Sequence, residues 1–96
     1  MVSDEDIAAY NEMRDRMLRM LFGSWLKSVR VEMGLTQAEF GKLFGITREH
    51  VGNIERGNNK PGLKTLPKMK KRIHQREWDR LDELERALIE REGWAG

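Results

Sequence analysis

Residues 34–57, GLTQAEFGKLFGITREHVGNIERG, hold the signals that decide the local fold. Thr36 stands three residues before Glu39, and these two residue types form the reciprocal capping box that opens a helix. Thr47 is a second N-terminal capping residue, and Gly45 just before it is a natural helix end. The stretch is therefore predicted to contain two short helices joined by a tight turn, which is a helix-turn-helix.

Helical patterns flank this stretch on both sides, and no alternating strand pattern is present. Ser3, followed by three acidic residues, predicts the start of an amphipathic helix. A further helix ends at Gly34, and Gly23-Ser24 either breaks or merely bends the path between the two. One long helix is predicted over residues 66–92. The expected fold class is all-α.

Length and composition exclude several classes of protein. A chain of 96 residues makes one small domain, with or without a helical arm. It has no cysteine, which excludes disulfides and a cysteine-based zinc site, and its two isolated histidines do not complete a metal site. No apolar run approaches the ~18 residues that span a membrane, and the acidic N-terminus is unlike a secretory signal. We therefore expect a cytoplasmic protein without a metal, a cofactor or a membrane partner.

The charge of the chain is unevenly distributed, although its formal net charge is only +2. Residues 64–76 contain six basic and no acidic side chains, whereas residues 77–96 contain seven acidic and three basic ones. A short block of positive charge beside a helix-turn-helix suits the footprint of a polyanion such as DNA. A solvated helix face is the alternative interpretation of the same run.

The helix that begins after Thr47 is predicted to have a polar outer side and an apolar inner side. Val51 and Ile54 share the inner side with Glu55, because residues three and four apart lie on one face. The outer stripe consists of Arg48, Glu49, Gly52, Asn53 and Arg56. A glycine inside a helix costs ~1 kcal/mol relative to alanine. This cost is reasonable where another body approaches the backbone closely, and a DNA major groove admits one α-helix.

Together these residues resemble a known family. The run from Gly34 to Phe40, the turn Gly45-Ile46-Thr47, then Val51, Ile54-Glu55-Arg56-Gly57 and Pro61 strongly resemble the phage-repressor-like (Xre/Cro) helix-turn-helix family. The resemblance runs without gaps over about residues 26–66. It implies a small helical domain with a lambda-repressor-like helix-turn-helix core, which binds double-stranded DNA.

The resemblance also implies a role for particular positions. Those that would read bases are Arg48, Glu49 and Asn53. Those that would lie near the DNA backbone are Gln37, Thr47, His50, Arg56, Asn58, Lys60 and Lys64. Arg30 and Glu55 match a partly buried structural ion pair of the family. For Glu49 two other interpretations stay open: a favourable acid near a helix N-terminus, or a brace for Arg48.

The sequence departs from the family inside the helix that follows Thr36 and again at both ends of the chain. Gly41 replaces the usual alanine and Phe40 a common leucine, and the family's fourth and fifth helices are followed poorly.

We predict three parts: an N-terminal amphipathic helix over residues 1–22, a helix-turn-helix core over 23–66, and a basic then acidic C-terminal helix over 67–96. The C-terminal helix is expected to form a homodimer through Trp78, Leu81, Leu84 and Leu88, either alone or with the N-terminal helix packed across it. Trp25 and Trp94 offer further apolar surface. Alternatively, these stripes complete the core of one chain.

The function expected is that of a sequence-specific transcriptional regulator, a dimeric repressor on an inverted-repeat operator, encoded by a bacterium, phage or plasmid. One alternative is an antitoxin-type interaction module with a toxin or other protein partner, which binds DNA for autoregulation. Another is a protein that coats DNA without specificity. We do not expect an enzyme, because no clustered histidines, phosphate-binding glycine loop or paired carboxylates are visible in the sequence.

Overall fold

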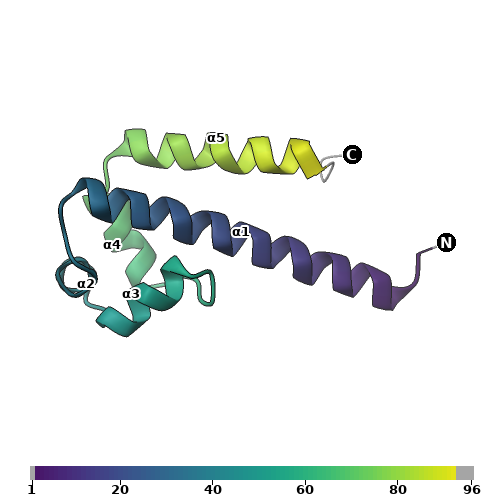
Figure 1. Ribbon diagram of the computed structural model, residues 1–96, viewed down its shortest axis with the longest axis horizontal. Coiled ribbons are helices and arrows are strands. Elements are labelled where there is room, and N and C mark those ends of the chain that lie inside the picture. The colour runs from purple at the N-terminus through teal and green to yellow at the C-terminus, as the bar shows by residue number, and fades with distance from the viewer. Residues whose placement is uncertain (1, 93–96) are drawn as a thin grey trace.

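The computed structural model of the protein describes residues 2–92, and the regular structure within that range is entirely helical. The helices are α1 (Asp4–Glu32), α2 (Gln37–Phe44), α3 (Arg48–Glu55), α4 (Thr65–Arg72) and α5 (Gln75–Glu92). Figure 1 shows α1 running the length of the molecule, with α5 alongside it in the opposite direction. The three short helices gather at one end of the molecule, where α3 packs against α1 and α2 packs against α3 and α4. The all-α expectation is confirmed.

The first three helices begin where the sequence placed their caps. The Ser3 hydroxyl accepts a hydrogen bond from the backbone N–H of Asp6 over 3.2 Å, and Thr47 accepts one from His50 over 3.0 Å. Thr36 and Glu39 form the complete reciprocal box, with bonds of 2.9 and 3.1 Å. These bonds hold the Glu39 carboxylate in its charged form, so they lower its pKa. Gly45 ends α2 at a φ of +70°, a conformation that glycine adopts without strain.

Gly23 neither breaks nor ends α1, which continues through it to Glu32. Instead, it lets α1 and α3 approach each other closely. A Cβ atom placed on Gly23 would lie only 2.2 Å from the carbonyl oxygen of Ile54 and 2.6 Å from that of Glu55. This contact between the two backbones fixes how deeply α3 sits against α1.

The prediction of one long helix over residues 66–92 is wrong. The chain leaves helical geometry at Ile73, whose backbone is extended, and α5 begins at Gln75. His74 supports the new start, because its Nδ1 accepts a hydrogen bond from the backbone N–H of Arg76 over 3.0 Å. Its carbonyl accepts a second bond from Glu77 over 2.9 Å. The break redirects the chain, so that α5 packs back on α1.

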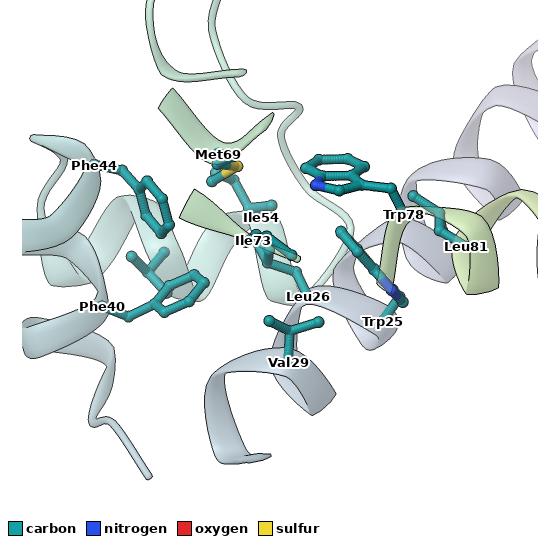
Figure 2. Packing of buried hydrophobic residues seen from close by; sticks show 11 residues of the cluster. Trp25, Leu26, Val29, Phe40, Phe44, Ile54, Met69, Ile73, Trp78 and Leu81 are labelled. Carbon is teal, nitrogen blue, oxygen red and sulfur yellow. The ribbon is translucent and has the colours of Figure 1, made fainter. Parts of the chain in front are cut away.

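One apolar core joins all five helices (Figure 2). Phe40 and Phe44 of α2 pack edge to face at its one end, with ring centroids 4.8 Å apart. At the other end, the rings of Trp25 and Trp78 lie 4.8 Å apart, and the Trp25 indole donates to the Glu77 carbonyl over 2.9 Å. The members of the core are Trp25, Leu26, Val29, Phe40, Phe44, Val51, Ile54, Met69, Ile73, Trp78 and Leu81.

Two of the four residues predicted to form the dimer surface lie in the core of one chain. Trp78 and Leu81 are each only 4% exposed, so α5 uses them to pack against its own chain. Leu84 is 38% exposed and Leu88 is half-buried. Trp78 and Leu81 of α5 and Trp25 of α1 thus belong to the core of one chain. Trp94 lies outside the described residues.

Candidate nucleic-acid interface

The inner side of α3 anchors it to the core. Val51 and Ile54 are fully buried, as the period of the helix predicted. Gly57 follows α3 at a φ of +79° and packs against α1, where a Cβ atom would lie 2.7 Å from Met20. Its carbonyl accepts a hydrogen bond from Arg19 over 3.2 Å. The buried inner side of α3 and the two contacts of Gly57 with α1 thus hold α3 in place relative to α1.

A polar network behind α3 joins three helices. Arg30 of α1 donates to both carboxylate oxygens of Glu55, over 2.6 and 3.1 Å, and to the Leu35 carbonyl over 2.9 Å. The side chains of Arg30 and Glu55 are only 12% and 4% exposed. The Gln37 amide donates to the same carboxylate over 3.1 Å. The donors from Arg30 and Gln37 compensate the negative charge of the buried Glu55 carboxylate. The bond from Gln37 also ties α2 to the end of α3.

The outer side of α3 carries exposed polar groups. Arg48 and Glu49 have side chains 67% and 73% exposed, and their charged ends lie 3.7 Å apart. Arg56 donates to the Asn53 Oδ1 over 2.8 Å. The Arg56 guanidinium also lies over Gly52, 3.0 Å from where a Cβ atom would stand. Arg56 therefore fills the space above Gly52. The sequence had led us to expect another molecule, such as DNA, in that space.

The residues assigned to the DNA backbone are in different surroundings. Asn58, Lys60 and Lys64 are exposed in the loop after α3. Gln37 and Thr47 are already engaged, the one with Glu55 and the other as a cap. His50 is half-buried, and within the described part of the chain its Nε2 atom is enclosed without a hydrogen-bond partner. Of these residues, the three in the loop are thus the most accessible to DNA.

The basic block of residues 64–76 does not form one continuous surface. Lys70 places its Nζ atom 4.1 Å from the centroid of the Trp78 ring, so it covers the core in a cation–π contact. Lys68 points elsewhere: its Nζ lies 3.3 Å from the position of a Cβ atom on Gly45, beside the turn between α2 and α3. Sequence reasoning did not single out Lys68, although its place in the basic run was the available signal.

A family model described as "Helix-turn-helix" matches residues 26–73, half of the chain. This chain belongs to the helix-turn-helix family. The matched region ends after α4, so the fourth helix lies inside the helix-turn-helix region. The family model thus extends to residue 73, beyond the resemblance seen in the sequence over about residues 26–66.

One curated protein of similar sequence is also named as a protein of helix-turn-helix type. It is the SPbeta prophage-derived uncharacterized HTH-type transcriptional regulator YonR of Bacillus subtilis (strain 168), which is 41% identical over 49 residues. The alignment covers 51% of this chain and 45% of the relative, so the chain spans less than half of that protein's length. No solved structure matches. Among the described residues, no helix is long and apolar enough to cross a membrane.

Proposed function

We propose that this helix-turn-helix protein is a sequence-specific double-stranded DNA-binding transcriptional regulator, acting in the cytoplasm as a dimeric repressor. The observation that carries the proposal is the contrast between the two sides of α3. Its inner side is fixed by buried packing and by the Arg30–Glu55 pair, while its outer side presents exposed polar groups. A rigid helix with free hydrogen-bonding groups is what direct readout of a major groove requires.

The residue types on the outer side suit particular bases. Arg48 can donate two hydrogen bonds to guanine, and Glu49 can accept from the amino group of cytosine. Asn53 can pair with adenine, because its Oδ1 retains a second lone pair while accepting from Arg56. Arg56 then acts as a positioning residue that holds the Asn53 amide in one orientation.

The cationic groups around α3 would position the protein on the duplex. Lys60 and Lys64 flank one end of the helix, and Lys68 stands beside the turn that precedes it. Contacts from such groups to phosphates fix register without reading sequence, and they release counterions. We therefore expect the affinity for DNA to fall steeply as salt concentration rises.

The regulatory role rests on the relative and on geometry. The relative is named a transcriptional regulator, which favours regulation over passive coating of DNA or an antitoxin role for this chain. A single recognition helix covers only a few base pairs, so two copies on an inverted repeat would provide the specificity of an operator. Repression would follow from a dimer that blocks the promoter; no enzymatic step is involved.

Selection of preferred duplexes from a random pool by the purified protein tests this proposal. The expected result is enrichment of an inverted repeat whose half-sites are centred about one helical turn, ~10 base pairs, or a multiple of it, apart. Equal retention of all duplexes would contradict sequence-specific binding, and enrichment of a single half-site would contradict the dimer.

A further inference from the structure

None of the other residues that the structure describes covers the N-terminal part of α1. Every residue from 2 to 13 is exposed, and Arg14 is the first half-buried one. The reason is visible in Figure 1, where the beginning of α1 projects past the end of α5. We call residues 4–20 the arm. An isolated helix shorter than ~12–15 residues is marginal in water, so the bare turns of the arm have little to stabilise them.

The arm nevertheless carries an apolar stripe. Tyr10, Met13, Met17 and Met20 follow the three–four–three spacing of a coiled-coil seam, and Ile7 lies one turn before them. Tyr10 is 40% exposed, Ile7 47%, and Met13 and Met20 51% each. A row of large apolar side chains on a projecting helix is surface that a second helix would bury.

The charges of the arm indicate what that helix is. Its tip is acidic, with Asp4, Glu5 and Asp6 in the first turn. Residues 12–19 are weakly basic, with a net charge of +1, since they hold Arg14, Arg16 and Arg19 together with Glu12 and Asp15. An antiparallel pair of arms centred near Met13 would bring each acidic tip within about one turn, ~5.4 Å, of the other copy's weakly basic segment. A parallel pair would set acid against acid. The arm is therefore complementary to itself, as a two-fold interface requires.

We propose that the arm pairs antiparallel with the arm of a second copy of this chain, with the two-fold axis near Met13. The inference rests on the dimer of the proposed function and says which surface forms it. It places the contact on α1, since Trp78 and Leu81 of α5 are used inside one chain. The N-terminal part of the arm projects away from α2 and α3 (Figure 1), while Arg19 and Met20 contact Gly57 after the end of α3. The outer side of both recognition helices therefore stays free for DNA.

Sedimentation at tens of micromolar, without DNA, tests the interface. The wild-type protein is expected to be a dimer, and Met13→Glu should raise its dissociation constant at least tenfold, because two carboxylates would meet at the axis. Ala8→Glu is the matched control: it adds the same charge to an exposed position on the opposite side of the arm, and it should leave the dimer intact. A monomeric wild type, or equal dissociation constants for the two variants, would overturn the proposal.

Two further variants test the geometry. Because the chain has no cysteine, Met13→Cys should give a disulfide-linked dimer under mild oxidation, and Ala8→Cys should not. The double variant Asp4→Lys, Asp6→Lys should weaken an antiparallel dimer at low salt, whereas it would strengthen a parallel one and so overturn the orientation. If the Met13→Glu protein is a monomer and still binds an isolated half-site, the arm is required for the dimer and the proposed DNA-binding function is retained. If the wild-type protein is a dimer but binds no DNA, the proposed function is contradicted and the proposed dimer is not.

Discussion

The two halves of α1 carry apolar residues with similar helical periods, yet within residues 2–92 the rest of the chain covers only one of the two halves. In the C-terminal half, Trp25, Leu26 and Val29 are at most 3% exposed. In the N-terminal half, Ile7 and Met13 are about half exposed, at 47% and 51%. The comparison teaches that periodicity locates the apolar side of a helix but not the surface that covers it. Substitutions should therefore affect folding in one half and association in the other.

The largest expected effect on folding comes from Arg30→Ala. It leaves the Glu55 carboxylate buried with only Gln37 to compensate it, at a cost of ~3–5 kcal/mol in the free energy of unfolding. Arg16→Ala in the exposed half of α1 and Arg48→Ala on α3 should each change it by less than about 0.5 kcal/mol. Denaturant unfolding of the three variants measures the difference. Equal unfolding midpoints would show that the network does not hold α3 in place.

A smaller loss is expected from Gly23→Ala. The added methyl group would meet the Ile54 carbonyl oxygen, so α1 and α3 must separate, at a cost of ~1–3 kcal/mol. The gain in helix propensity, ~1 kcal/mol, opposes this cost. Asn11→Ala in the bare half is the control, since it changes propensity without a contact. Thermal unfolding should show a lower Tm for Gly23→Ala alone. A Tm at or above that of the wild type would contradict the close approach.

The smallest expected effect on thermal stability comes from replacing Glu85, which lies on α5 where this helix packs on α1. Burial raises the pKa of the Glu85 carboxyl, Asp82 adds to the rise and Lys70 opposes it. The folded state therefore binds this proton more tightly than the unfolded state, so the contribution of Glu85 to stability falls as pH rises through the raised pKa. Glu85→Gln should raise Tm at pH 7 by a few degrees at most, because solvent screens a half-exposed charge.

The pH dependence provides the control for that variant. Below the ordinary pKa of a glutamate both proteins are neutral at position 85, so their Tm values should converge at acid pH. A gain that persists unchanged into acid would show that packing, rather than charge, is responsible.

The sequence predicted those features of the fold that local chemistry determines. The caps at Ser3, Thr36 and Thr47 form hydrogen bonds within three residues, so they can be recognised without knowledge of the fold. The turn at Gly45 is local in the same sense. The outward direction of Arg48 and Glu49 follows from the helical period once Val51 and Ile54 are taken as buried.

Features that depend on backbone approach, on tertiary packing or on the conformation of one side chain could not be predicted. Gly41 was visible only as a departure from the family, whereas the structure places the Ile46 carbonyl oxygen 2.5 Å from where a Cβ atom would stand. The break before α5 relies on a histidine cap and on the packing of Trp78, and histidine is not among the usual capping residues. Similarly, the contact of Arg56 over Gly52 depends on a side-chain rotamer.

The most direct test of the central claim, that the outer side of α3 reads bases, is to compare duplex selection by Arg48→Ala and by Lys60→Ala. We expect Arg48→Ala to bind the wild-type site ~1–3 kcal/mol more weakly and to lose preference at one base pair of each half-site. Lys60→Ala should weaken binding to all sequences alike and reduce its salt dependence, while it keeps the preferred sequence. An unchanged base preference in the Arg48→Ala protein would contradict the assignment of α3 as the recognition helix.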